Sequence, residues 1–292
     1  MKPQKWIRPS LTAGATAAQA FAANLAAAAE QVNANVPGFL ASRNPEYLHQ
    51  LRIGLRRMRS TLRAFRCLAR RRPSSAFDTK LRSTLRTLGV ARDWDAFGES
   101  DVPMPLRRAA RGSRAQALRK ARAAVRHKRF KSLPGGVLRW AATEPWRKSA
   151  DPRELIGSFG ARALKRLHSE LSDCAAGIDW ADGERRHRVR IRAKRLRYGL
   201  DCFASGFAPE SIERFTHRLH ALQEVLGELN DCRVQRGLLR KVAYQRPGRV
   251  ASVAKSRLAS RERRLIGKAG ESWSRLEAHS PHWRREAARA RG

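Results

Sequence analysis

Two stretches of the chain carry rows of positively charged side chains at a helical spacing. The first row is His49, Arg52, Arg56, Arg59 and Arg63, and the second is His187, Arg190, Lys194 and Arg197. Steps of three and four residues place each row along one line of a helix, and the longer line measures about 21 Å. Like charges at this spacing repel one another. An extended polyanion would turn that repulsion into affinity; the alternative interpretation is a basic helix face that only water contacts.

Arginine suits a phosphate partner because its planar guanidinium donates two parallel hydrogen bonds and keeps its charge. Each row begins with a histidine, His49 or His187. Neighbouring cations are expected to lower the pKa of these histidines in the free protein, and bound phosphate is expected to raise it. Because arginine does not titrate near neutral pH and an exposed lysine hardly does, the histidines are expected to account for any pH dependence of binding. A purely structural role for both histidines is the alternative.

The two rows belong to an internal repeat with an offset of 138 residues. Seven of seventeen positions are identical between residues 49–65 and residues 187–203. At the same offset, residues 88–93 match residues 226–231, and Arg119 and Arg126 match Arg257 and Arg264. A repeat of this size indicates that one large supersecondary unit occurs twice. We therefore add these four arginines to the candidate site.

Apolar periodicity and the placement of proline and glycine predict helices throughout the chain. The predicted helices are 10–35 with Ser10 as N-cap and a stop at Pro37, 45–72, 74–88 with a stop at Gly89, 106–131, a short one reaching Trp140, 151–176, 182–204, 209–226 with a stop at Gly227, and 249–278. Asp93 and Asn230 are expected to begin short continuations. Asp93 and Asp231 are interpreted as helix caps or as partners of a row arginine. No stretch shows the period of two that is typical of strands.

The predicted fold class is therefore all-α, with two antiparallel four-helix bundles related by pseudo-twofold symmetry. The expected division is an N-terminal tail at 1–9, a first bundle at 10–142, a linker at 143–150, a second bundle at 151–283 and a basic tail at 284–292.

The charge balance narrows the class of partner. The chain has 292 residues, with 62 Lys and Arg against 25 Asp and Glu, which gives a formal net charge of +37. A field of this size recruits polyanions such as nucleic acid, an anionic membrane surface or inorganic polyphosphate. No apolar segment is long enough to predict membrane insertion. The four cysteines show no paired spacing, which favours reduced thiols and a cytoplasmic location.

Sequence signatures of catalysis and of metal binding are missing. The sequence has no glycine-rich phosphate loop with its lysine, no His-Glu-x-x-His and no Gly-x-Ser-x-Gly. Magnesium-dependent phosphoryl transfer needs clustered carboxylates, and the acids of this chain are spread thinly. His217 and His220 lie three residues apart with Glu224 nearby, but no further metal ligand accompanies them. We therefore expect no catalytic residue, no metal and no cofactor.

The paired motifs resemble those of the CHAD family, which is named for a conserved histidine α-helical domain. The resemblance is carried by His49-x-x-Arg52-x-x-x-Arg56-Arg57-x-Arg59, by His187-x-x-Arg190-x-x-x-Lys194-Arg195-x-Arg197-Tyr198, and by the Leu-Gly-x-x-x-Asp motifs that begin at Leu88 and Leu226. It covers nearly the whole chain. It implies two pseudo-symmetric four-helix bundles that bind inorganic polyphosphate along a basic surface between them, in the cytoplasm and on polyphosphate granules.

One position departs from the repeat. Asp201 stands where the first copy has Arg63, so the two row ends are not expected to contribute equally. Two other functions stay open, namely nonspecific nucleic-acid binding and, as a weaker alternative, an enzyme of polyphosphate metabolism. The sequence places few aromatic residues near the rows, and base stacking would need them.

Overall fold

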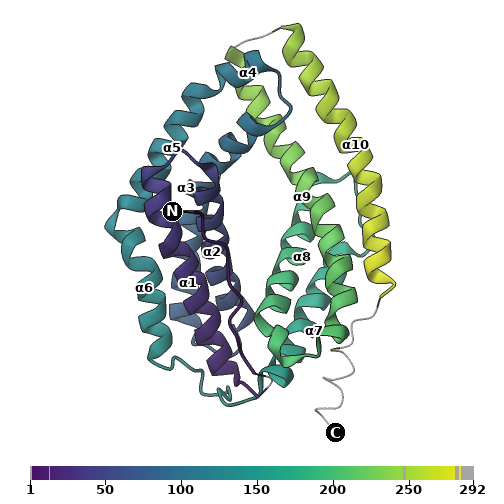
Figure 1. Cartoon of the computed structure of the whole chain (residues 1–292). Helices are drawn as coiled ribbons and strands as arrows, with labels where there is room; N and C mark the ends of the chain where they lie inside the picture. The colour runs from purple at the N-terminus through teal and green to yellow at the C-terminus, as the bar shows by residue number, and fades with distance from the viewer. Residues whose placement is uncertain (1, 13, 246–247, 280–282, 284–292) are drawn as a thin grey trace.

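The computed structural model describes residues 2–12, 14–245, 248–279 and 283 and confirms the all-α fold. The first half contains α1 (Ala17–Ala41), α2 (Pro45–Ala64), α3 (Arg71–Glu99), α4 (Met104–Ala109), α5 (Arg111–Arg126) and α6 (Lys128–Ala142). The second half contains α7 (Ile156–Ala175), α8 (Gly183–Phe203), the short 3-10 helix η1 (Ala204–Gly206), α9 (Pro209–Gln245) and α10 (Arg249–Glu277). Figure 1 shows the two halves side by side.

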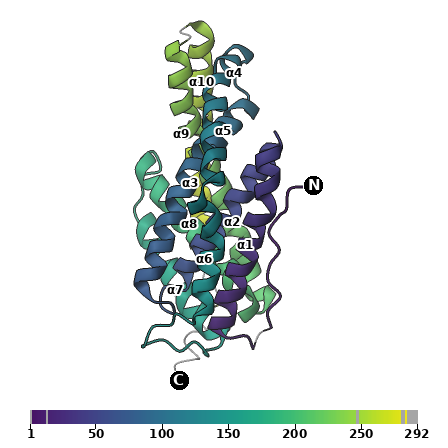
Figure 2. The same cartoon turned by 90° about the vertical axis from the view of Figure 1, so that its left-hand side faces the viewer.

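The halves meet where α2 packs against α8, and these are the two helices that carry the rows. At this contact the ring centroids of Phe65 and Phe203 lie 5.0 Å apart, and Phe159 of α7 stacks on Phe65. Phe65 and Phe203 are equivalent positions of the repeat. A residue that touches its own equivalent lies beside the axis relating the two copies, so this contact supports the expected pseudo-twofold relation. At the other end of the molecule α4 lies against α9, beside the α9–α10 hairpin (Figure 2).

The first predicted helix was placed too early in the chain. Helix α1 begins at Ala17, where the Thr16 side chain accepts a hydrogen bond from the Gln19 backbone N–H and the Gln19 side chain accepts one from the Thr16 backbone N–H. This capping box, and not Ser10, defines the start. The helix also continues through Pro37 to Ala41. Packing along α2 outweighs the hydrogen bond that the proline removes.

The predicted stops at Gly89 and Gly227 are also wrong, because α3 and α9 run through them without interruption. Asp93 and Asn230 therefore lie inside helices and do not start continuations. Interior glycine costs a helix only about 1 kcal/mol relative to alanine, and burial of the flanking leucines offsets that cost. The break at Pro134 is absent as well, since α6 includes it, and the basic stretch 106–131 is divided among α4, α5 and α6.

The expected domain boundaries stay a prediction. Helix α6 ends at Ala142 and α7 begins at Ile156, so the expected linker lies between helices. Beyond α10, the buried Trp283 packs edge-on against Phe215. The expected basic tail at 284–292 lies outside the described residues.

Candidate anion-binding site

The row residues nearest the pseudo-twofold axis come together from both halves. Arg52 and Arg56 lie on α2, and Arg190 and Lys194 lie on α8; we call these four residues the central cluster. Burial, followed by the charge of Arg56 from the opposite half, lowers the pKa of Arg190 to about 10. Arg56 and Lys194 are equivalent positions of the repeat, and the charge of Arg56 acts on Lys194 across the axis.

Lys194 is strongly perturbed by this arrangement. Burial of its ammonium group, together with Arg190 and Arg56, lowers its pKa from 10.5 to about 7. Lys194 therefore titrates close to neutral pH in the free protein. The expectation that lysine hardly titrates in this range holds for exposed side chains and does not apply to Lys194, which is half-buried.

Arg52 is the most deeply placed member of the central cluster, with 8% of its surface exposed. Its Nη1 donates a hydrogen bond to the backbone carbonyl of Leu85 at 3.0 Å. The guanidinium passes over Gly89 of α3, where a Cβ atom would lie 2.9 Å from Nη1. Burial and Arg56 lower the pKa of Arg52 to about 10. Gly89 thus makes room for the Arg52 guanidinium, whereas the sequence predicted that Gly89 ends a helix.

The two histidines lie half-buried beside the central cluster. Burial lowers the pKa of His49, and Arg92, Arg56 and Arg52 lower it further against the opposing effect of Glu46. Burial likewise lowers the pKa of His187, helped by Arg233, Arg190 and Lys194 and opposed by Glu184. The direction expected from sequence is confirmed for both, although burial is the largest cause.

Two acids lie among these cations, Asp93 on α3 and its repeat equivalent Asp231 on α9. Burial and the charge of Asp231 raise the pKa of Asp93, and Arg52 and Arg56 act in the opposite direction. Both acids lie inside helices, so neither is an N-cap. In the described part of the chain no ion pair ties the central cluster to a carboxylate. The cations at the axis are therefore only partly compensated.

The C-terminal ends of the rows have other partners. Arg63 binds Asp78 of α3 through two hydrogen bonds of 2.8 and 2.9 Å, and Arg59 donates to the same carboxylate at 2.8 Å. Arg197 lies 5.0 Å from the ring centroid of Tyr198, its neighbour on α8. The structure thus gathers the first part of each row at the axis and directs Arg59 and Arg63 to a protein carboxylate.

The four arginines added from the outer part of the repeat are exposed, and they are Arg119 and Arg126 on α5 and Arg257 and Arg264 on α10. Figure 1 places α5 and α10 at opposite edges of the molecule, with α2 and α8 between them. The structure does not bring these four together with the central cluster. Their contact with a ligand stays a prediction.

Sequence reasoning missed Arg92 and Arg233, which act on the pKa of His49 and His187 respectively. They are not equivalent positions, because the repeat places Asn230 opposite Arg92 and Asp95 opposite Arg233. Each half therefore supplies an additional arginine from a different helix turn. The only signal was that Arg92 stands inside the Leu-Gly-x-x-x-Asp motif.

Other site types find little support in the structure. Among the described residues, no group of three or more His, Cys, Asp or Glu side chains could hold a metal ion. His220 instead lies 3.4 Å from the Glu224 carboxylate on the surface of α9. In the same part of the chain, no helix combines the length and the apolar character that a membrane span requires.

Comparison with known proteins identifies the family. A family model for the CHAD domain matches residues 23–240, which is well over half of the chain. The chain belongs to the CHAD family. This CHAD domain is similar to the crystal structure of the CHAD domain from the plant Ricinus communis, with 27% identity, a TM-score of 0.85, and coverage of 96% of this chain and 98% of that one. PptA from Streptomyces chartreusis shares the fold at 15% identity and a TM-score of 0.66, over 90% of this chain and 99% of that one. No curated protein matches the chain.

Proposed function

We propose that this CHAD domain binds inorganic polyphosphate across the central cluster, with His49 and His187 at the two ends of the contact. The observation that carries the proposal is that cations of both halves are held together at the axis with depressed pKa values. Their mutual repulsion is a cost that a bound polyanion relieves. Polyphosphate binding is a general property of the family, and the pairing of equivalent positions suits a ligand whose units are all alike.

Nucleic acid is the second candidate, because the net charge supports it equally well. The central cluster is formed by cations and histidines, and few aromatic side chains accompany it to stack bases. A competition assay separates the two ligands. Labelled long-chain polyphosphate is bound at near-physiological salt and challenged with DNA and RNA at equal phosphate concentration. Retention of the label supports the proposal, and displacement by DNA or RNA at stoichiometric concentration would favour nucleic acid.

We further propose that the protein is a binding module and not an enzyme, and that polyphosphate granules are its site of action. Asp93 and Asp231 are the acids that act on the central cluster, and both lie among cations. The expected result is no phosphate release from polyphosphate above the buffer rate, and co-localisation of the tagged chain with granules. Phosphate release that depends on added Mg²⁺ would contradict the first part, and a diffuse distribution the second.

Salt dependence tests whether the central cluster makes the ion pairs. Affinity for polyphosphate is expected to fall log-linearly with salt, and each lost phosphate contact should reduce the slope by about 0.7 to 0.9. Arg56→Ala with Lys194→Ala should therefore reduce the slope by about one to two units. The matched control is Arg147→Ala with Lys148→Ala, which removes the same charges from the exposed segment between α6 and α7. Equal slopes for both variants would mean that only the overall field attracts the ligand.

Gly89 offers a test of Arg52 that leaves Arg52 itself unchanged. Gly89→Ala places a methyl group against the Arg52 guanidinium, whereas a Cβ on its equivalent Gly227 meets nothing within 4 Å. Both glycines lie inside helices, so alanine should stabilise either helix by up to about 1 kcal/mol. We expect Gly89→Ala to weaken polyphosphate binding several-fold without loss of stability, and Gly227→Ala to leave it unchanged. Calorimetric titration and thermal unfolding measure the two quantities, and equal affinities would remove Arg52 from the site.

A further inference from the structure

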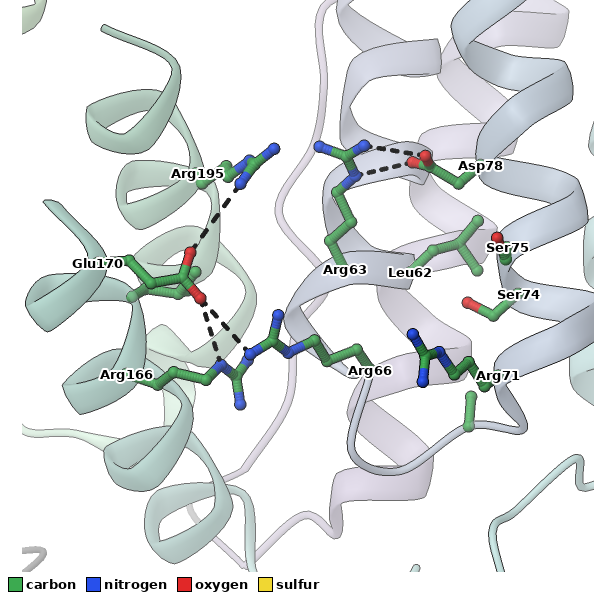
Figure 3. A pocket seen from close by; sticks show the side chains of 12 residues that line it. Leu62, Arg63, Arg66, Arg71, Ser74, Ser75, Asp78, Arg166, Glu170 and Arg195 are labelled. Carbon is green, nitrogen blue, oxygen red and sulfur yellow. Dashed lines mark hydrogen bonds and ion pairs between the residues drawn. The ribbon is translucent and has the colours of Figure 1, made fainter. Parts of the chain in front are cut away.

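A pocket of about 270 Å³ opens at the base of the molecule, between the end of α2, the start of α3, and helices α7 and α8 (Figure 3). Its lining includes five arginines contributed by both halves of the chain: Arg63, Arg66, Arg71, Arg166 and Arg195. Ser74 and Ser75 from the first turns of α3 also line it. The pocket is separate from the central cluster, since it shares no lining residue with it.

The pocket lies where the internal repeat departs from symmetry at one pair of positions. On one side of the axis, Arg57 forms an ion pair of 3.0 Å with Asp201. The equivalent pair on the other side is Arg195 and Arg63, because Asp201 occupies the position equivalent to Arg63. Burial and the charge of Arg63 lower the pKa of Arg195. An attractive pair on one side is thus a repulsive pair on the other.

The attractive side is closed and the repulsive side is open. The N-terminal segment covers Arg57, whose guanidinium lies 3.5 Å from the ring centroid of Trp6, and Arg8 approaches Asp201 at 3.6 Å. On the other side of the axis the pocket opens at the equivalent place, and Arg63 and Arg195 both line it. An arginine-lined opening at this position is suited to a ligand that supplies the missing negative charge.

The acids at the pocket do not neutralise its arginines. Glu170 is shared among three of them, with Arg66 at 3.5 Å, Arg195 at 3.9 Å and Arg166 at 4.0 Å, and Arg192 from outside the lining also pairs with it. Asp78 is shared between Arg59 and Arg63. Arg71 at the start of α3 pairs with neither acid. Counting Arg71, seven arginines therefore surround two carboxylates.

Unused hydrogen-bond donors accompany the excess charge. Nε and Nη2 of Arg166 and Nε of Arg195 are buried and have no hydrogen-bond partner in the described part of the protein. Helix α3 begins at Arg71 without a side-chain cap, and Arg71, Ser74 and Ser75 line the pocket, so the positive end of its dipole lies beside the pocket. Charged donors from two sides and a helix N-terminus are the groups that proteins use to bind phosphate.

We propose that this pocket is a second anion site, which binds a small phosphoanion such as pyrophosphate between the two halves of the domain. Its volume lies just below the range of pockets that hold drug-sized ligands, so it fits a few phosphate groups and not a long chain. The site does not depend on the proposed function of the central cluster, because different residues form it.

The test is calorimetric titration of the full chain with inorganic pyrophosphate. Arg71→Ala with Arg166→Ala is expected to weaken pyrophosphate binding about a hundredfold, since each lost charged hydrogen bond lowers the affinity by roughly a factor of ten. The matched control is Arg72→Ala with Lys165→Ala, which removes two charges at the adjacent exposed positions outside the pocket. Binding in the control should equal that of the unchanged protein.

Two outcomes would overturn the proposal. If the pocket variant and its matched control lose the same affinity for pyrophosphate, only the overall positive field of the protein attracts this ligand. If Arg56→Ala with Lys194→Ala weakens pyrophosphate binding and the pocket variant, Arg71→Ala with Arg166→Ala, does not, pyrophosphate binds at the central cluster. The proposed function has its own readout, because long-chain polyphosphate binding should persist in the pocket variant whether or not pyrophosphate binds there.

A measurement on the unchanged protein covers the case in which the pocket variant does not fold. Arg166 Nη1 donates a hydrogen bond of 3.3 Å to Sγ of the exposed Cys67, so a movement of Arg166 would take a cationic donor away from that sulfur. Pyrophosphate that draws Arg166 into the pocket should slow alkylation of Cys67 by iodoacetamide at least about threefold relative to half-buried Cys174. An unchanged ratio of the two rates at saturating pyrophosphate would overturn the proposal.

Discussion

Replacing Arg190 and Lys194 together by glutamate is expected to weaken the binding of long-chain polyphosphate at least about a hundredfold. Each change removes a charged contact and puts a negative charge where a phosphate should lie. The Arg52–Arg56 side remains intact, but it faces α8 across the axis and cannot hold the chain alone. The effect should be much smaller for tripolyphosphate, because a short ligand gains little from the second half. Calorimetric titration with both ligands measures the difference.

The same variant is not expected to be less stable. The depressed pKa values of Arg190 and Lys194 mean that their charged forms are disfavoured in the folded protein. Glutamates at these positions would face Arg56 and replace repulsion by attraction, so the melting temperature should stay constant or rise. The control is Arg147→Glu with Lys148→Glu, which changes the charge equally at exposed positions. An equal loss of polyphosphate affinity in the control variant would contradict a single site across the axis. Full binding by each half when the other is disabled would contradict it as well.

Such a combination of higher stability and lost binding is typical of functional sites, where selection retains an arrangement that costs folding free energy. The central cluster fits this pattern because its cations lie close together and partly buried without an ion pair to a described carboxylate. The ion pair of Arg57 with Asp201 shows the contrasting, structural use of a cation on the same helix pair. The role of a cation on these helices therefore depends less on its position in the row than on the charge of the side chain opposite it.

The sequence was sufficient for the helices, the repeat and the cations at the axis, because these follow from periodicity along single helices. Helix ends were predicted less well. Gly89 is predicted to end a helix because glycine disfavours helix, but its lack of a side chain allows Arg52 to cross α3. That role depends on packing between two helices, which no local pattern encodes.

The fate of Arg59 and Arg63 shows the same limit. Both continue the first row in perfect period, but each forms an ion pair with Asp78 from the next helix. Asp78 lies fifteen residues from Arg63 in the chain, so no spacing rule connects the two. Asp201 was visible as a departure from the repeat, and the sequence predicted that the row ends would differ. That the difference opens a pocket beside Arg195 required the arrangement of α2, α7 and α8.

The burial of Lys194 changes the expected pH dependence of binding. In the free protein the pKa of Lys194 is about 7, and the pKa values of His49 and His187 lie below the ordinary histidine value of 6.5. Bound phosphates favour the charged form of all three groups and so raise these pKa values. The complex then holds more protons than the free protein, and linkage requires the affinity for polyphosphate to rise as the pH falls.

The gain in polyphosphate affinity should occur in two pH ranges, and a different variant should abolish the gain in each range. Lys194 contributes from the pKa of its bound form down to its free value near 7, and the histidines contribute mainly below that. Each unit by which binding raises a pKa is worth up to about tenfold in affinity, so we expect at least about a tenfold gain between pH 8.5 and 6. Lys194→Arg keeps the charge and should remove the upper part. His49→Gln with His187→Gln should remove the lower part.

Neighbouring charges set the direction of these shifts but do not produce the slope. Arg52, Arg56, Arg92, Arg190, Arg197 and Arg233 act to lower the pKa values of the three groups, and Glu46, Glu184 and Asp231 act to raise them. The pKa of Asp93 is raised by burial, and phosphate would raise it further, so it adds to proton uptake at the acid end of the range. The control is His217→Gln with His220→Gln on α9, which should keep the full slope. If the triple variant of Lys194, His49 and His187 keeps it as well, these three side chains do not contact the ligand, and the histidines that begin the two rows are structural.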